Sequence, residues 1–150
     1  MVKRVSEKVF VAVAPRRGKY DIEEVARGGI NLIINNRPDG EAHDQMSSAE
    51  IEANARALGM DYIHLPVTPA QISDDQIAAM TEALRKGADG YTLLTCRTGM
   101  RAMTMYALAQ ASTGMKSEDL MEIGKTMGFD LMDHRDRMVQ LNAAAEKAEA

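Results

Sequence analysis

Short apolar segments alternate with amphipathic segments along most of the chain. Segment 32–34 is apolar at every position, which is typical of a strand buried on both faces of a sheet. The segments between the apolar runs carry apolar residues at helical spacing. The predicted strands are 9–13, 32–34, 61–65 and 91–95. This alternation predicts an α/β domain with a mainly parallel central sheet flanked by helices.

Capping residues mark the ends of the predicted helices. Ser47 with Glu50, and Ser73 with Gln76, have the spacing of capping boxes, which satisfy free N–H groups at a helix start. The predicted helices are 21–27, 47–59, 73–87, 101–112 and, as the final helix, 117–127. We expect one domain over 1–150, and 139–150 as a frayed helical tail because it has no apolar stripe.

A parallel sheet brings the carboxyl ends of its strands to one edge, where the active sites of such folds lie. Three predicted loops meet at that edge, over residues 35–40, 66–73 and 96–101. The last loop reads Cys96-Arg97-Thr98-Gly99-Met100-Arg101. The topology therefore indicates a site at this edge.

The 96–101 loop has the residues that an anion-binding loop around a nucleophile requires. Gly99 can adopt a positive φ, so successive N–H groups can point inward, and the next helix adds its positive end. Arg101 can hold two oxygens of a tetrahedral anion. The same groups favour the thiolate form of Cys96. An inert core thiol is the commoner fate of a lone Cys, but Arg97, Gly99 and Arg101 suit a buried packing segment poorly.

We predict Cys96 and Arg101 as catalytic residues, and the segment between them as the anion-binding set: Arg97, Thr98, Gly99 and Met100. Asn36, Arg37 and Asp39 are predicted to support the site from the 35–40 loop. Arg37 would add positive potential, and Asp39 would orient Arg37 or Arg101; a surface ion pair in an Asp-Gly turn is the equally weighted alternative. For Asn35 and Asn36 we favour a strand end over bonding to the loop.

The composition of the chain limits which classes of partner it can bind. The net charge of −4, from 18 basic and 22 acidic residues, argues against a nucleic acid or an anionic membrane surface as partner. We expect a cytoplasmic protein, because the chain has neither an apolar span nor a secretory leader pattern. His43, His64 and His134 do not share ligand spacing, so no metal and no cofactor are expected. The sequence leaves the oligomeric state open.

Four segments resemble the phosphatase-like domain of the beta-lactamase hydrolase-like proteins, a family also described as sulfurtransferase-like. They are 33–41, 49–52, 62–67 and 96–101, and the similarity extends over about residues 5–115. The resemblance implies a dual-specificity-phosphatase-like α/β fold, with Cys96 as nucleophile and Arg101 as oxyanion clamp.

The chain also departs from the pattern of a cysteine phosphatase. Only four residues separate Cys96 from Arg101, one fewer than in those enzymes and closer to rhodanese-like spacing. Thr95 replaces the usual His, Ala102 replaces a Ser or Thr, and no Asp follows the third strand closely enough to act as general acid.

Three functions remain. A sulfurtransferase with a Cys96 persulfide ranks first, because a stable leaving group needs no acid. Its substrate would be a sulfane sulfur donor, and its partner a separate sulfur-accepting protein. A cysteine phosphatase acting on a small anionic phosphoester ranks second. A non-catalytic anion-binding module ranks third.

Overall fold

The computed structural model describes residues 2–12 and 21–149. A five-stranded sheet has the order β1-β2-β5-β3-β4, and every pair is parallel except β1 with β2. The strands are β1 (Val2–Arg4), β2 (Val9–Ala12), β3 (Leu32–Asn35), β4 (Asp61–His64) and β5 (Thr92–Thr95). The helices are α1 (Ile22–Arg27), α2 (Ser48–Ala57), α3 (Asp74–Lys86), α4 (Met100–Ser112), α5 (Ser117–Thr126), a 3₁₀ turn η2 (Met132–His134) and α6 (Arg135–Glu149).

The predicted α/β class and the mainly parallel sheet are confirmed. Val13, placed in the first strand by its hydrophobicity, lies outside the described residues, and the last strand begins at Thr92 rather than Tyr91. Strand β1 was not predicted, because its three residues, one apolar and two charged, are too few to form a pattern.

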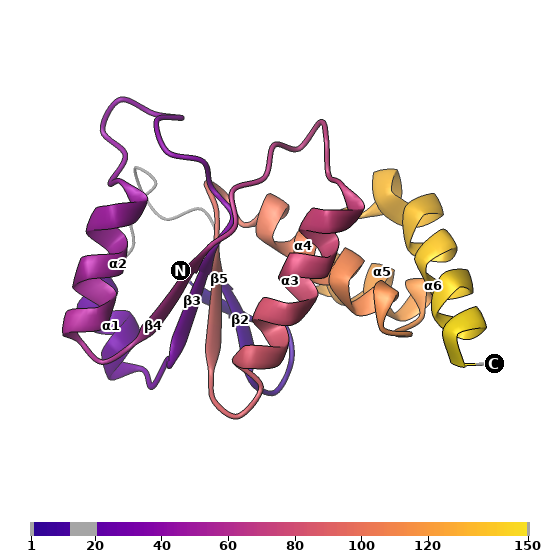
Figure 1. Cartoon of the computed structure of the whole chain (residues 1–150), viewed down its shortest axis with the longest axis horizontal. Coiled ribbons are helices and arrows are strands. Elements are labelled where there is room, and N and C mark those ends of the chain that lie inside the picture. Colours follow the sequence, from indigo (N-terminus) through magenta and orange to yellow (C-terminus); the bar gives the residue numbers. More distant parts are fainter. Residues whose placement is uncertain (1, 13–20, 150) are drawn as a thin grey trace.

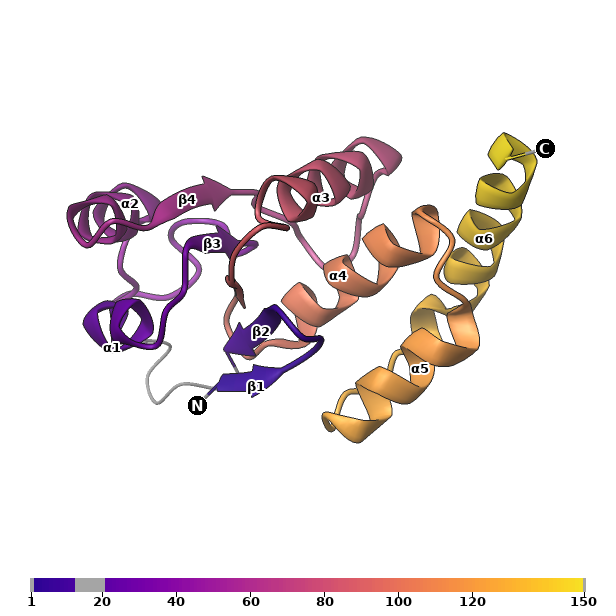
Figure 2. The same cartoon turned by 90° about the horizontal axis from the view of Figure 1, so that it is seen from below.

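Both faces of the sheet are covered. Ile33 and its neighbour Leu93 face α1 and α2, whereas Ile34 and Leu94 face α3 and α4, since side chains alternate along a strand. Figures 1 and 2 show the two pairs of helices on opposite sides of the sheet. The two-sided burial expected for segment 32–34 is therefore observed.

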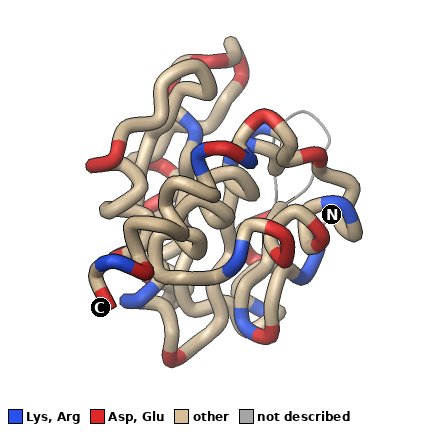
Figure 3. The backbone as a smooth tube through the Cα atoms, turned by 90° about the vertical axis from the view of Figure 1, so that its right-hand side faces the viewer, with Lys and Arg blue, Asp and Glu red and all other residues tan. Residues whose placement is uncertain are grey.

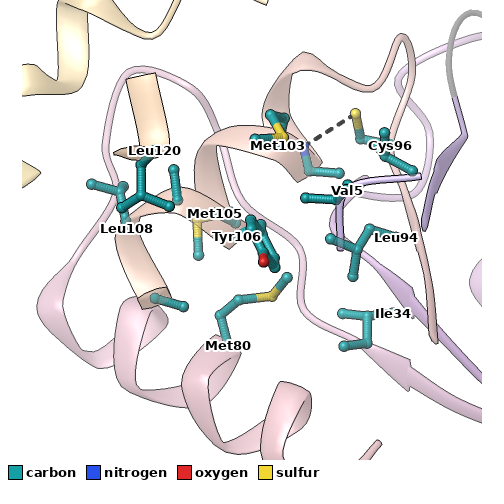
Figure 4. Close-up of a cluster of buried hydrophobic side chains, with 14 of the residues drawn as sticks. Val5, Ile34, Met80, Leu94, Cys96, Met103, Met105, Tyr106, Leu108 and Leu120 are labelled. Atoms are coloured by element: carbon teal, nitrogen blue, oxygen red, sulfur yellow. Dashed lines mark hydrogen bonds between the residues drawn. The ribbon is translucent and has the colours of Figure 1, made fainter. Parts of the chain in front are cut away.

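Helix α4 is the centre of the larger core. Nine of its thirteen residues are buried, as its nearly continuous apolar sequence predicts. Figure 4 shows Met103 and Tyr106 of this helix among Val5, Leu94 and Met80 from the surrounding elements. The start of α4 is consequently held at a fixed position relative to the end of β5.

A helix beyond the predicted final one covers the outer side of α4. Met138 of α6 is fully buried, and burial of a side chain of this size contributes about 1.5–3 kcal/mol. The Asn142 amide donates to the carbonyls of Ala111 (3.1 Å) and Met115 (2.8 Å) and accepts from the N–H of Ser117 (2.9 Å). Residues 139–149, expected as a tail, thus belong to a helix docked on α4 and α5.

Acidic and basic residues are interspersed on the side that carries α5 and α6 (Figure 3). Within the described ranges, the helices are all too short or too polar to cross a membrane.

Candidate active site

Strand β5 and helix α4 hold the Cys96 loop between them. Cys96 follows the last residue of β5 directly, and only 7% of its surface is exposed. Gly99 is the N-cap of α4 with φ 99°, a left-handed conformation that costs little for glycine and is strained for other residues. The positive φ predicted for Gly99 is therefore what lets the chain turn from strand to helix here.

Two backbone N–H groups donate to the Cys96 sulfur. The N–H of Gly99 lies 3.0 Å from Sγ and that of Ala102 lies 3.4 Å from it; a dashed line in Figure 4 marks a hydrogen bond to this sulfur. Both donors belong to the start of α4, where the helix dipole is positive. This geometry stabilises negative charge on the sulfur, as a nucleophilic thiolate requires.

Further donors around the loop remain free. The N–H groups of Arg97, Thr98, Met100 and Arg101 donate to no acceptor within residues 2–12 and 21–149. The first N–H groups of a helix have no partner inside it, so they are available to a ligand. Arg97 and Thr98 are also exposed. The loop can therefore offer several N–H groups to the oxygens of an anion placed at the sulfur.

Arg101 is held by a carboxylate that the sequence analysis did not single out. Its Nη1 lies 3.0 Å from Glu41 Oε2, and its Nη2 lies 3.3 Å from Glu41 Oε1. Nη1 also donates to the Val67 carbonyl at 3.1 Å. The Arg101 side chain is 13% exposed, and its buried Nε has no partner among the described residues. Three of the five N–H groups of the guanidinium are thus engaged, which fixes its orientation, and the buried Nε–H is unpaired among the described residues.

Glu41 also binds Arg37, so one carboxylate joins two arginines. Arg37 Nε donates to Glu41 Oε1 at 3.1 Å, and the Arg37 side chain is nearly buried. Partial burial raises the pKa of Glu41. The hydrogen bonds from Arg101 and Arg37, together with the charges of both, lower this pKa by more than burial raises it, so the net pKa lies below the usual 4.5. Glu41 is therefore ionised at neutral pH and is a poor general acid.

Asp39 does not make the arginine contact that was one of the two roles weighed for it. Asp39 Oδ1 accepts the backbone N–H of Ser48 at 2.7 Å, which satisfies a free donor at the start of α2. Glu41, two residues later, reaches the arginines instead. Asp39 supports the loop through α2 and does not orient either arginine.

Asn35 and Asn36 do more than end a strand, contrary to our preference. Asn35 is 4% exposed; its Oδ1 accepts from Arg37 N–H at 3.0 Å and from Thr95 Oγ1 at 3.3 Å. Its Nδ2 donates to the Tyr62 hydroxyl at 3.0 Å, which also bonds the Ser48 hydroxyl at 2.7 Å. Burial raises the pKa of Tyr62, although both partners favour the opposite shift, so this phenol stays neutral.

Asn36 connects the same loop to the segment after β4. Its Nδ2 donates to the Leu65 carbonyl at 3.0 Å, and its own carbonyl accepts the Val67 N–H at 3.0 Å. The His64 ring nitrogen Nε2 lies 2.8 Å from the Arg37 carbonyl. The three loops predicted to meet at the carboxyl edge are thus joined by hydrogen bonds.

Buried polar residues immediately after apolar strands were the signal that could have identified this network. Asn35 and Thr95 are the last residues of β3 and β5, and Asn36 follows β3; at these buried positions an unpaired polar group would cost stability. Glu41 lies in a polar loop, and its sequence context carries no comparable signal.

Other candidates lie apart from the site. His43 is exposed, and His134 belongs to η2. Asp74 starts α3 and pairs with Arg137, while Asp75 is exposed. In the part of the chain that the structure describes, no three His, Cys, Asp or Glu residues cluster as metal ligands would.

Comparison with solved structures places this arrangement in the cysteine phosphatase fold. A putative phosphatase from Neisseria meningitidis is 27% identical, with a TM-score of 0.76 over 92% of this chain and 96% of the other. The Pseudomonas aeruginosa protein TpbA, solved in complex with phosphotyrosine, is 15% identical, with a TM-score of 0.65 over 97% of this chain and 90% of that one. The dual-specificity-phosphatase-like fold is confirmed.

Sequence comparison is more specific. A beta-lactamase hydrolase-like protein from Agrobacterium fabrum is 35% identical over 129 residues, which are 85% of this chain and 29% of that protein. The chain therefore spans less than a third of the length of this curated relative. The model of the beta-lactamase hydrolase-like protein, phosphatase-like domain, matches residues 3–113. With the Cys96 loop, this fold is that of a thiol-dependent enzyme. The chain belongs to the phosphatase-like domain family of the beta-lactamase hydrolase-like proteins.

Proposed function

We propose that this domain is a cysteine-dependent phosphatase that acts on small phosphate monoesters, with Cys96 as nucleophile. The observation that carries the proposal is the position of the Cys96 sulfur under two N–H donors at the start of α4, next to a loop that ends in Arg101. The phosphatase-like family and the phosphotyrosine held by a protein of the same fold support it.

The reaction would run in two balanced steps. The Cys96 thiolate attacks phosphorus, forming a phosphorus–sulfur bond as the ester oxygen leaves with the bonding electrons and takes a proton from water. Water then cleaves the phosphorus–sulfur bond and returns the thiolate and inorganic phosphate. Free loop N–H groups and Arg101 Nε would hold the equatorial oxygens, where charge develops.

Departure of the ester oxygen is the weak point of this site. The loop after β4 contributes Thr68 and Gln71 but no carboxylate near Val67, and Glu41 is held ionised. General acid catalysis contributes about 10²–10⁴-fold. We therefore expect turnover to depend steeply on the acidity of the leaving group, with aryl phosphates cleaved far faster than alkyl phosphates.

Sulfur transfer is the second candidate, favoured by the four-residue spacing between Cys96 and Arg101. The thiolate would attack the outer sulfur of thiosulfate, forming a sulfur–sulfur bond and releasing sulfite, and the persulfide would pass its sulfur to cyanide or to a separate sulfur-accepting protein. The sequence ranked this activity first. The family and the structural neighbours favour the phosphatase, so the order is now reversed.

A paired assay tests both candidates. The purified domain and its Cys96→Ser variant are incubated with p-nitrophenyl phosphate, and separately with thiosulfate and cyanide. Cys96-dependent release of p-nitrophenol alone supports the phosphatase, whereas Cys96-dependent thiocyanate alone replaces it with sulfur transfer. If neither product exceeds that of the variant, the anion-binding module remains, and phosphate binding followed by calorimetry tests it.

A further inference from the structure

The C-terminal helix reaches the edge of the sheet that carries the site, although it lies outside the family match over residues 3–113. Arg137 of α6 donates from Nη1 to the Ile72 carbonyl and from Nη2 to Asp74 Oδ1 at 2.8 Å. Figure 1 shows the start of α6 beside the start of α3, which follows this loop. A residue beyond the matched region thus holds the end of a site loop.

The contacted loop, residues 65–73, is fixed to Arg101 at its other end. Val67 is buried; its N–H donates to the Asn36 carbonyl at 3.0 Å, and its carbonyl accepts from Arg101 at 3.1 Å. Between Val67 and Ile72 the chain makes a tight turn, in which Gln71 N–H donates to the Thr68 carbonyl at 3.1 Å. Because this turn is short and bonded, displacement of Ile72 would be transmitted to Val67.

We propose that Arg137 is a positioning residue of the active site, which acts on Arg101 through the 65–73 loop. The loop is fixed by two hydrogen bonds, one from Arg101 to the Val67 carbonyl and one from Arg137 of α6 to the Ile72 carbonyl. Loss of the hydrogen bond from Arg137 lets the Val67 carbonyl move. The Arg101 guanidinium, which this carbonyl orients, then loses a fixed acceptor. The consequence for substrate anions rests on the proposed function of Arg101.

Arg137 is not required to dock α6. Met138 is fully buried on the same helix, Leu141 packs against the core, and Asn142 bonds α4 and α5. Substitution at position 137 should therefore leave α6 in place. Arg135, on the same helix, is exposed and makes no side-chain hydrogen bond within the described residues, which makes it a matched control.

The test compares Arg137→Ala, Arg137→Lys and Arg135→Ala in the full chain. Amide hydrogen exchange is measured over residues 66–74 and over α6, and inhibition by inorganic phosphate is measured with p-nitrophenyl phosphate as substrate. We expect Arg137→Ala to accelerate exchange in the loop but not in α6, and to weaken phosphate inhibition about threefold to tenfold, the effect of one lost hydrogen bond. Arg137→Lys should recover part of both effects, since one ammonium can still reach the Ile72 carbonyl.

The proposal is overturned by unchanged loop exchange in Arg137→Ala, with or without faster exchange throughout α6, or by equal effects in Arg135→Ala. A KM and phosphate inhibition that stay constant while only the unfolding temperature falls would show a purely structural role. If the wild-type chain neither turns over the aryl phosphate nor binds phosphate, the proposed function fails, and loop exchange alone then decides the positioning role.

Discussion

The polar groups at the two ends of the sheet differ in burial: they are buried at the carboxyl ends of the strands and exposed at the amino ends. At the carboxyl ends of the strands, Asn35, Arg37 and Thr95 are buried, and the side-chain oxygen of Asn35 accepts from the Arg37 N–H and the Thr95 hydroxyl. At the amino ends, a hollow of about 460 Å³ is bordered by the exposed residues Arg56, Asp61, Lys86 and Asp89.

This difference in burial distinguishes a binding site, in which charged groups are held in place, from a hollow lined by exposed side chains. The ion pairs of Arg56 with Glu52 and Asp61 join side chains that are 44–84% exposed, and exposed pairs contribute about 0–1 kcal/mol. The pair of Arg101 with Glu41 joins side chains that are 13% and 24% exposed. Desolvated, fixed charge is what substrate binding uses, so we expect function at the carboxyl edge only.

The largest effect is expected at Cys96, the proposed nucleophile. Cys96→Ser should reduce turnover about 10³-fold or more, because a hydroxyl, which is a weaker nucleophile than a thiol, replaces the sulfur under the same N–H donors. Steady-state turnover of p-nitrophenyl phosphate measures this, with a denaturation curve as control. Residual turnover within tenfold of wild type would show that the carboxyl edge works without its thiol.

Asn35 should give the next largest effect, on stability. Asn35→Ala leaves Tyr62, Arg37 N–H and Thr95 Oγ1 without their common partner in a buried setting, and we expect a loss of about 2–3 kcal/mol in the free energy of unfolding. Urea denaturation measures it, with Asn54→Ala on the exposed face of α2 as the matched control. Equal losses in both variants would contradict a buried network at this edge.

Glu41→Gln should cost less, about 1–2 kcal/mol, because Glu41 is partly solvated and Gln keeps an acceptor. The pKa of Glu41 is lowered in the folded chain, so its charge stabilises the fold above the usual 4.5, and this contribution is lost as pH falls through the lowered pKa. The difference in unfolding free energy between wild type and variant should be constant near neutral pH and shrink below pH 4.5. A difference that grows on acidification would refute this assignment.

The smallest effect is expected at the amino edge. Arg56→Ala removes two exposed ion pairs and should change the free energy of unfolding by about 0.5 kcal/mol or less, with unchanged turnover. Chemical denaturation and the aryl phosphate assay check both values. A tenfold fall in turnover would place a functional group at the amino edge and contradict the expectation that function lies at the carboxyl edge only.

Local patterns in the sequence were sufficient for the framework of the site. Apolar runs and capping residues predicted the order of the elements from β2 to α5, but neither β1 nor α6, and Ser73 with Gln76 forms the predicted capping box. Gly99 adopts the positive φ that its place in the Cys96 loop predicts. These features depend on residues a few positions apart, and backbone sterics and hydrogen bonding act at that range.

The partners within the site were decided by tertiary structure. Glu41 and Arg101 are 60 residues apart, and Arg137 and Ile72 are 65 apart, so their contact depends on how the loops and α6 pack. Asp39 is as good a carboxylate as Glu41 by sequence, yet its side chain is engaged at the start of α2. The amino-acid sequence by itself thus determined where Cys96 and its loop stand, whereas the fold decided which charges orient Arg101, because side-chain pairing depends on distances that only packing establishes.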